Sequence, residues 1–354
     1  MGSSLLRVDP ESLLLRVDGN AGIGGGHVMR CLALAQAWQE AGGRAAFASA
    51  DLAPSLRQRV LNEGFQYCVI AANSGSQGDA VETTAIARRC SAATVVIDGY
   101  HFDYRFRKPL HAAGLITVAI DDNGEVGHCA DSLIVNQNIH ASSALYRYGE
   151  ARSKLLLGTD YVLLRREFRD GIRAAAGRSG PVRKLLVTMG AADRDNATSR
   201  VIDSLRELGM PQIEIQVVVG GANPHALEIE KACSSLPGAR AVRDPGAGMA
   251  TLIAHADIAI IAGGSTMWEL AAMGVPFVSI VVAENQRLAA SAMDALGFPT
   301  VAAANLELEL PARMRELVSD AARRKALGDI GRRLVDGQGA SRVCDEVFRL
   351  ARGV

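Results

Sequence analysis

The sequence lacks the features that mark nucleic-acid-binding and membrane-spanning proteins. Its 354 residues include 38 Lys and Arg and 38 Asp and Glu, so the chain has no net charge. Proteins that bind nucleic acids normally carry a basic excess or a basic stripe, because they must neutralise phosphates. No stretch approaches the length of about 18 consecutive apolar residues that a membrane-spanning helix requires. We therefore expect neither a nucleic-acid partner nor insertion into a membrane.

Cysteine is scattered along the chain, which argues against a structural metal site and a disulfide framework. The six cysteines form no CxxC pair and no paired spacing with the seven histidines, and both kinds of site depend on such spacings. Reduced cysteines are typical of the cytoplasm. The N-terminus also lacks the basic and apolar regions of a secretory signal. The sequence predicts a cytoplasmic protein without a bound metal.

Short apolar runs alternate with helical patterns in the first half of the chain. The runs lie at 13–18, 45–49, 67–71, 94–98, 116–121 and 133–136. Strands without a polar face that alternate with helices are typical of a parallel sheet covered on both sides. Residues 4–9 (SLLRVD) nearly repeat residues 13–18 (LLLRVD). We assign the second copy to the first buried strand and expect residues 1–12 to form a disordered leader.

A second series of strands and helices follows the Gly-, Arg- and Ala-rich stretch 170–181, which we interpret as a linker. Its strands are expected at 184–189, 214–219, 240–242, 258–261 and 277–282. At about 100–200 residues per domain, the length also favours two domains. The sequence predicts an α/β protein with two doubly wound, Rossmann-like domains, 13–175 and 181–330, with a ligand cleft between them. A charged helical tail begins at Leu308, and its last part, 331–354, is expected to form a separate C-terminal helix.

A glycine-rich loop, GIGGGHVMR at 22–30, follows the first predicted strand and opens the first long helix. Glycines allow a ligand to approach the backbone closely, and a helix N-terminus favours an anion. A nicotinamide-binding loop is the alternative, with Asp51 as the ribose ligand. The fingerprint GxGxxG, however, requires a third glycine where this chain has His27.

His27 is the candidate catalytic residue of this loop. A neutral histidine at a helix start can accept a proton, and the helix N-terminus helps to keep it neutral. The structural alternative is a capping or packed histidine. Asp18 and Arg16 are expected on the same rim, where Asp18 would orient His27, bind a sugar hydroxyl or cap the loop.

A second glycine loop, AGGSTMWE at 262–269, follows the strand 258–261. Its amides and hydroxyls can donate to a diphosphate, and Glu269 can accept hydrogen bonds from both ribose hydroxyls. The alternative is a capping box between Thr266 and Glu269. After the next strand, Asn285 and Gln286 can contact sugar acetamido and hydroxyl groups, although Asn285 could equally be a helix N-cap.

Together these motifs resemble nucleotide-sugar enzymes of the MurG type, which have the GT-B fold. They are more similar to the PseG family, the UDP-2,4-diacetamido-2,4,6-trideoxy-β-L-altropyranose hydrolases of pseudaminic acid biosynthesis. The similarity runs from about residue 13 to at least residue 297. The matching segments are RVD (16–18), GGGHVMRCL (24–32), IDGY (97–100), IDD (120–122), NQN (136–138), LGTDYVLLR (157–165), TMGAAD (188–193), Asn196, the loop at 263 and NQ (285–286).

The resemblance implies hydrolysis of the bond between the anomeric carbon and the UDP oxygen, with inversion and without a metal or other cofactor. His27 matches the family's catalytic histidine, which would activate water. Tyr100 and Asn285 match residues of the sugar site, to which we add Asp18 and Gln286. The expected UDP-binding residues are Gly24, Gly25, Gly190, Gly263, Gly264, Ser265, Thr266 and Glu269. In GT-B proteins a terminal helix often returns to the first domain, and 341–351 is the candidate here.

The sequence departs from the family where Ala191 follows Gly190 in place of a paired glycine, which leaves the identity of the sugar open. Relatives of this architecture also act in legionaminic acid and spore-coat sugar pathways. Three other functions remain: a glycosyltransferase with the same UDP site, a UDP-sugar 2-epimerase, and a nucleotide-sugar-binding protein without turnover. We expect a UDP-sugar as the partner and a monomer or weak homo-oligomer as the assembly.

Overall fold

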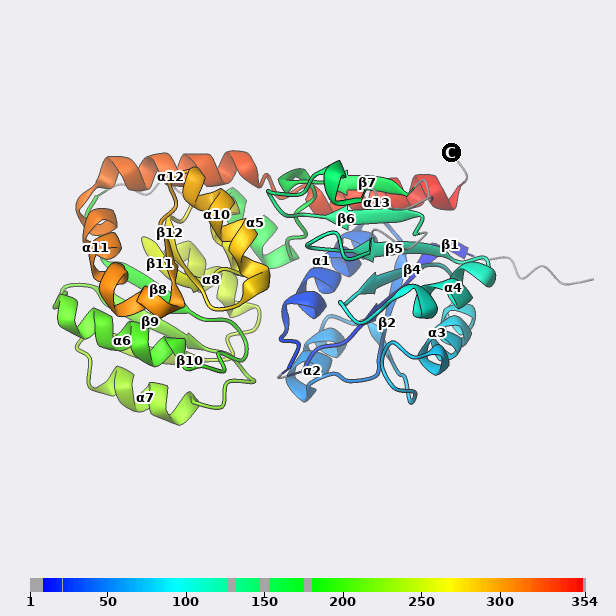
Figure 1. The fold of residues 1–354 in the computed structure, drawn as a ribbon, viewed down its shortest axis with the longest axis horizontal. Helices are drawn as coiled ribbons and strands as arrows, with labels where there is room; N and C mark the ends of the chain where they lie inside the picture. The colour runs from blue at the N-terminus through cyan, green and yellow to red at the C-terminus, as the bar shows by residue number, and fades with distance from the viewer. Residues whose placement is uncertain (1–8, 21, 127–130, 147–152, 175–179, 353–354) are drawn as a thin grey trace, which may run out of the picture. The chain divides into compact units, whose positions relative to one another are not determined.

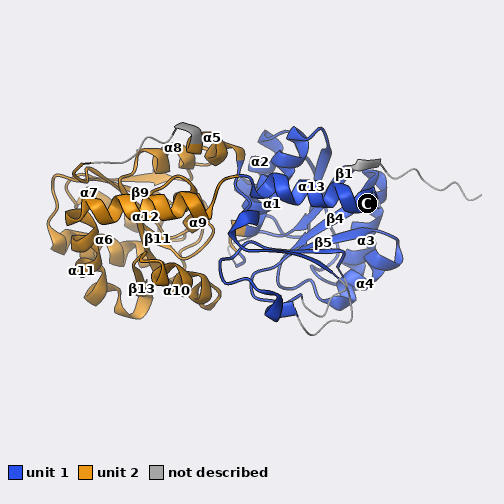
Figure 2. Cartoon of the chain, turned by 90° about the horizontal axis from the view of Figure 1, so that it is seen from above, with its two compact units in different colours: residues 1–23, 27–165, 338–354 blue, residues 24–26, 166–337 orange. Residues whose placement is uncertain are grey.

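The computed structural model describes residues 9–20, 22–126, 131–146, 153–174 and 180–352. The chain divides into two compact units, each built on one parallel sheet (Figure 2). Unit 1 comprises residues 1–23, 27–165 and 338–354, and unit 2 comprises residues 24–26 and 166–337. The predicted α/β class with two doubly wound, Rossmann-like domains is confirmed. No helix within the described ranges is long and apolar enough to cross a membrane.

Unit 1 holds a seven-stranded sheet of order β3-β2-β1-β4-β5-β6-β7 (Figure 1). Its strands are β1 (Asp9–Val17), β2 (Arg44–Ser49), β3 (Gln66–Val69), β4 (Ala92–Asp98), β5 (Ile116–Ile120), β6 (Leu133–Asn136) and β7 (Lys154–Leu157). Its helices are α1 (Gly26–Glu40), α2 (Pro54–Asn62), α3 (Gln77–Arg89), α4 (Tyr104–Ala112), α13 (Gly339–Ala351) and the short turns η1 (Ser143–Tyr146) and η2 (Thr159–Tyr161).

Strand β1 is apolar on both faces because helices cover both faces of the sheet. Leu13, Leu15 and Val17 pack in one buried cluster with residues of α1 and α13. Leu14 points to the other face, into a cluster with residues of α3 and α4. The absence of a polar face therefore follows from burial on two sides, as expected of a parallel sheet.

Helix α13 is part of unit 1, although α12 before it belongs to unit 2. Its buried face joins the cluster around Trp38, and the Phe348 ring stacks on the indole with centroids 4.0 Å apart. The Arg342 guanidinium donates to the carbonyl of Asp160 at 2.8 Å. Helix α13 thus completes the core of unit 1.

Unit 2 holds a six-stranded sheet of order β10-β9-β8-β11-β12-β13. Its strands are β8 (Lys184–Thr188), β9 (Glu214–Val219), β10 (Ala239–Arg243), β11 (Ile258–Ala262), β12 (Phe277–Val281) and β13 (Thr300–Ala302). Its helices are α5 (Arg166–Ala174), α6 (Ala197–Leu208), α7 (Ala226–Ser234), α8 (Gly248–His255), α9 (Thr266–Ala272), α10 (Arg287–Ala295), α11 (Leu306–Ser319), α12 (Ala321–Leu334) and the turns η3 (Glu284–Gln286) and η4 (Ala303–Asn305).

The predicted boundaries differ from the structure at three places. Strand β1 begins at Asp9, so the predicted leader 1–12 is wrong in its last four residues, and the rest of it lies outside the described residues. The chain passes from unit 1 to unit 2 at Arg166 rather than after residue 175, because α5 packs on α8 and α9. The region 331–354 is split, since α12 continues to Leu334 and the next helix starts at Gly339.

Helices α9 and α12 pack with their backbones in contact, and glycine makes this approach possible. A Cβ added at Gly331 would lie 2.6 Å from the carbonyl oxygen of Ala271. We expect Gly331→Ala to destabilise unit 2 by roughly 1–3 kcal/mol, the usual cost of overpacking. This loss would outweigh the gain of about 1 kcal/mol in helix propensity. The midpoint and slope of urea unfolding measure the effect.

The matched control is Gly171→Ala in α5. A Cβ there meets the end of the Met273 side chain, at 2.8 Å from Cε, and a flexible side chain can move. We expect this variant to unfold within about 0.5 kcal/mol of the wild type. A Gly331→Ala protein as stable as the control would show that the two helices tolerate greater separation.

Candidate functional site

The site in unit 1 lies at the edge of the sheet where the parallel strands end. Strands β1 and β4 are neighbours, with Val17 opposite Asp98. The chain connects in one direction from β1 through β2 to β3, and then returns to the other side of β1 with β4. Ligands of doubly wound sheets bind at such a reversal. The loops after these two strands therefore form the predicted binding edge.

His27 is the second residue of α1 and its side chain is buried, with 9% of the residue exposed. Its ring meets Tyr100 edge-on, with centroids 5.0 Å apart and an interplanar angle of 82°. Its Nδ1 is buried and has no hydrogen-bond partner among the described residues. Burial lowers the pKa of His27, and the positive charge of Arg30 acts in the same direction. The imidazole is thus neutral at pH 7 and able to accept a proton.

A buried cluster beneath His27, the Arg30 cluster, joins α1 to the ends of β4 and β5. The Arg30 guanidinium donates to both carboxylate oxygens of Asp98, at 2.6 and 2.7 Å, and to Asp122 at 2.7 Å. Burial opposes the ionisation of Asp122, but the charge of Arg30 and its hydrogen bond hold the pKa of this carboxyl well below its usual range. Two carboxylates share one guanidinium, so the cluster keeps a negative charge.

Tyr100 is held by the same cluster. Its hydroxyl donates to Asp122 Oδ2 at 2.8 Å, while Asn138 donates to Oδ1 at 2.9 Å. The residue is 46% exposed. Because its hydroxyl hydrogen is already engaged, Tyr100 can offer a ligand its ring and the acceptor side of its hydroxyl oxygen. A cavity of about 330 Å³ lies beside it, with Phe102, Asp121 and Glu125 in its lining.

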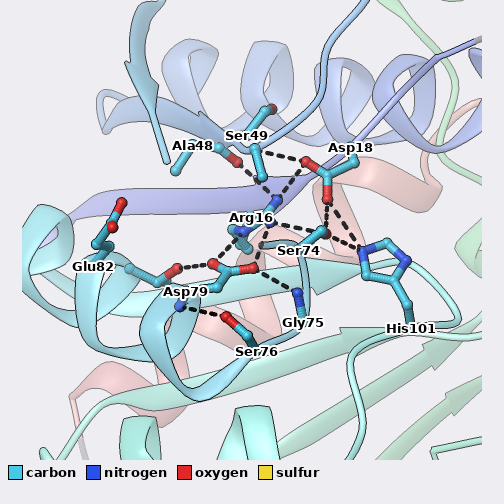
Figure 3. Close-up of polar contacts among 12 residues, drawn as sticks. Arg16, Asp18, Ala48, Ser49, Ser74, Gly75, Ser76, Asp79, Glu82 and His101 are labelled. Atoms are coloured by element: carbon cyan, nitrogen blue, oxygen red, sulfur yellow. Dashed lines mark hydrogen bonds and ion pairs between the residues drawn. The ribbon is translucent and has the colours of Figure 1, made fainter. Parts of the chain in front are cut away.

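A second buried cluster, the Arg16 cluster, lies at the end of β1 (Figure 3). The Arg16 guanidinium, 0% exposed, pairs with Asp18 at 2.8 Å and with Asp79 at 2.6 Å. The Asp18 carboxylate also accepts from the backbone amides of Ala50 and Asp51, at 2.8 and 3.1 Å. Ser74 and His101 contact the same carboxylate.

These contacts correct two predictions from the sequence. Arg16 is fully buried rather than on the rim, because its charge is neutralised inside the sheet edge by two carboxylates. Asp18 contacts His101, at 3.1 Å from Nε2, and among the described residues none of its hydrogen bonds reaches His27. Five groups of unit 1 already contact the Asp18 carboxylate, and its contact with a sugar stays a prediction.

In unit 2 the candidate residues lie in three loops at one edge of the sheet. Gly190 follows β8, the loop 263–265 follows β11, and Asn285 and Gln286 follow β12. The three strands are neighbours and parallel, so their ends meet. A Cβ added at Gly263 would lie 3.2 Å from Cβ of Gln286. Glycine at this position therefore lets the last two loops pack together.

Of the two structural alternatives offered for unit 2, the N-cap at Asn285 is not formed. Helix α9 begins at Thr266, and its N-cap, Ser265, makes no side-chain capping hydrogen bond. Glu269 is buried. Asn285 is exposed and precedes the N-cap of α10, which is Gln286. The side-chain oxygen of Gln286 accepts from the amide of Val282 at 3.0 Å, so this residue shapes the loop.

In the loop between β1 and α1, Gly24 has a φ of 82°, in the left-handed region that favours glycine. Gly25 is buried. Gly190 also has a left-handed φ, of 87°. The described residues contain no group of three or more His, Cys, Asp and Glu side chains that could hold a metal ion.

Sequence reasoning assigned no role to Arg30, Asp98, Asp122 or His101. Asp98 and Asp122 had a detectable signal, since Asp98 is the last residue of the buried strand β4 and Asp122 lies two residues after the end of β5. His101 stands next to Tyr100, but its partner Ser74 lies in the loop before α3, where no pattern pointed to it.

Comparison with known proteins supports the fold assignment. No family model matches the sequence. The chain is 27% identical over 233 residues to the spore coat polysaccharide biosynthesis protein SpsG of Bacillus subtilis, a match that spans 63% of this chain. The match covers 66% of the length of that curated relative, just under two thirds.

Solved structures resemble almost the whole chain. MurG of Acinetobacter baumannii superposes with a TM-score of 0.65 at 14% identity, covering 96% of this chain and 99% of that one. The MnaA–UDP complex of S. aureus superposes with a TM-score of 0.68 at 10% identity, covering 97% of each chain. Identities this low show the fold alone. The chain is a two-domain α/β protein with the GT-B fold of MurG.

Proposed function

We propose that this chain is an enzyme of nucleotide-sugar metabolism that hydrolyses a UDP-linked diacetamido-trideoxy sugar to free sugar and UDP. The observation that carries the proposal is His27, a buried imidazole with lowered pKa and an unpartnered Nδ1 at the start of α1. The resemblance to PseG-type hydrolases gives this histidine the role of base. Similarity to SpsG, a polysaccharide biosynthesis protein, and the UDP-bound structure of MnaA support the substrate class.

In the proposed reaction, neutral His27 accepts a proton from water as the water oxygen bonds to the anomeric carbon. The bond between that carbon and the β-phosphate oxygen breaks, and UDP departs with the electron pair. The backbone amides and hydroxyls of residues 263–266 would hold the diphosphate, and Glu269 would accept hydrogen bonds from the ribose. UDP is a good leaving group, so positioning, a base and donors for the diphosphate charge suffice.

The test is a UDP-release assay without metal and without an acceptor, on UDP-2,4-diacetamido-2,4,6-trideoxy-β-L-altropyranose and related 6-deoxy sugars. NMR of the product should show the free sugar with inverted anomeric configuration. Release that requires an added acceptor would indicate a glycosyltransferase, and a C2 epimer with UDP still attached would indicate an epimerase. Binding without either product would leave a nucleotide-sugar-binding protein.

The proposed ribose contact makes a separate prediction in unit 2. We expect Glu269→Gln to weaken UDP binding roughly 10- to 100-fold, because hydrogen bonds to a charged group contribute about 1.5–3 kcal/mol. Titration calorimetry with UDP measures the change. The control is Glu284→Gln, an exposed carboxylate paired with Arg287, which should leave UDP affinity unchanged. Equal affinities for the two variants would remove Glu269 from the UDP site.

A further inference from the structure

His101 is a second histidine at the sheet edge that holds His27. It follows β4 directly after Tyr100, the residue whose ring contacts His27. Its side chain is 32% exposed. The mechanism proposed above does not use it.

The contacts of His101 determine which ring nitrogen carries the proton. Its Nε2 lies 3.1 Å from Asp18 Oδ2 and 2.7 Å from Ser74 Oγ. Arg16 pairs with the Asp18 carboxylate, so this group is ionised and can only accept. The Ser74 hydroxyl donates its hydrogen to Asp18, so its oxygen can only accept from the imidazole. Nε2 is therefore an N–H donor, and Nδ1 carries the lone pair in the neutral ring.

The ring is also held sterically in one orientation. Gly75 and Gly99 both have left-handed φ values, of 74° and 152°. A Cβ at Gly75 would lie 2.6 Å from the His101 carbonyl oxygen, and one at Gly99 would lie 2.9 Å from Cε1. The Phe102 ring packs at 4.1 Å between centroids. Glycine at position 75 leaves room for the backbone of His101, and glycine at position 99 leaves room for its imidazole. The two loops therefore fix where the ring lies.

We infer that Nδ1 of His101 accepts a hydrogen bond from a hydroxyl or acetamido N–H group of the bound sugar, and that Asp18 is the positioning residue that sets this tautomer. Nδ1 points away from Asp18 and Ser74 (Figure 3) and has no partner within the part of the chain that the structure describes. When a carboxylate accepts a hydrogen bond from one ring nitrogen of a neutral histidine, the other ring nitrogen is left as an acceptor. The inference rests on the proposed nucleotide-sugar function.

Two substitutions separate this role from a packing role. In His101→Gln the side-chain amide can reach Asp18 from the position of Nε2, but no acceptor remains at Nδ1. In His101→Asn the side-chain oxygen can stand near Nδ1, but the contact with Asp18 is lost. We expect the Gln variant to lose about tenfold in kcat/KM for the altropyranose substrate, which corresponds to one hydrogen bond. The Asn variant should keep more kcat/KM than the Gln variant but unfold more easily, and UDP affinity should be unchanged in both.

The reverse order, with the Gln variant equal to the wild type and the Asn variant impaired, would overturn the inference and leave His101 a packing residue. Failure of the hydrolase proposal can be distinguished from failure of the His101 inference, because in the first case the wild type itself would release no UDP. Calorimetry then compares UDP with the UDP-sugar. The inference is supported if the wild type binds the UDP-sugar more tightly than UDP and the Gln variant does not. It is overturned if the wild type binds the two ligands equally, or if the Gln variant still binds the UDP-sugar more tightly than UDP.

Discussion

Replacement of His27 by alanine is expected to lower kcat for UDP release by roughly 10²–10⁴-fold, the usual contribution of a general base. Its ring is the buried, neutral imidazole beside Tyr100, and no other side chain of the described site is proposed to remove a proton from water. UDP affinity should be retained, since the His27 side chain is not among the expected UDP contacts, which are Gly24, Gly25, Gly190 and residues 263–269. Initial rates and UDP calorimetry on the same preparations measure the two effects.

The pH dependence of kcat/KM is a second test of His27 as the base. A base acts in its neutral form, and burial lowers the pKa of His27. Wild-type kcat/KM should therefore stay high as the pH falls past about 6.5, the usual value for histidine, and decline only at lower pH. The His27→Ala variant should lack this decline. His255→Ala, which removes an imidazole from α8 of unit 2, is the matched control. A near-normal rate in His27→Ala would refute the assignment.

Loss of the Arg16 guanidinium is expected to destabilise the protein by about 3–5 kcal/mol, the cost of breaking a buried ion pair from one side. The Arg16→Met variant keeps much of the side-chain volume but leaves Asp18 and Asp79 without their cation. Both carboxylates are almost fully buried. They must then remain charged without compensation or take up protons, and either outcome favours the unfolded state. Urea unfolding at pH 7 measures the loss.

The destabilisation should depend on pH with a definite sign. Burial disfavours the charge on Asp18, but hydrogen bonds from His101 and Arg16 outweigh it and hold its pKa well below the usual range. Such a group stabilises the fold above its unfolded pKa of about 3.9 and loses this contribution as the pH falls towards the folded value. The difference between wild type and Arg16→Met should therefore be largest at neutral pH and shrink in acid.

The control for this prediction is Arg287→Met, which breaks an exposed pair with Glu284. Exposed pairs contribute about 0–1 kcal/mol, so this variant should unfold close to the wild type. Two variants with similar unfolding midpoints would mean that Arg16 contributes no more than a surface charge. A large loss in Arg16→Met that stayed the same from pH 7 down to a pH well below about 3.9, the unfolded pKa of Asp, would point to packing rather than to charge.

Local sequence patterns were sufficient for most of the fold. The apolar runs at 94–98, 133–136 and 214–219 coincide with β4, β6 and β9 within a few residues. The two glycine loops were placed correctly after β1 and β11. By contrast, β13 has only three residues, and β7, although as long as β6, has one buried residue where β6 has four, so neither gives a continuous apolar run. Helix α4 contains Pro109, a residue that normally argues against a helix interior.

The sequence by itself determined that this is a two-domain α/β protein with buried strands and a glycine loop in each half. Strands that are buried on both faces appear as apolar runs, and loops with unusual backbone conformations appear as glycines, so both features can be recognised locally. Only the tertiary structure decided which charges meet. Asp18 contacts His101, 83 positions away, and Arg30 binds Asp98 and Asp122. These partners come together because β4 lies beside β1 and β5 beside β4. Strand order is a property of the whole sheet, so no stretch of sequence around Asp18 could show that its histidine is His101 rather than His27.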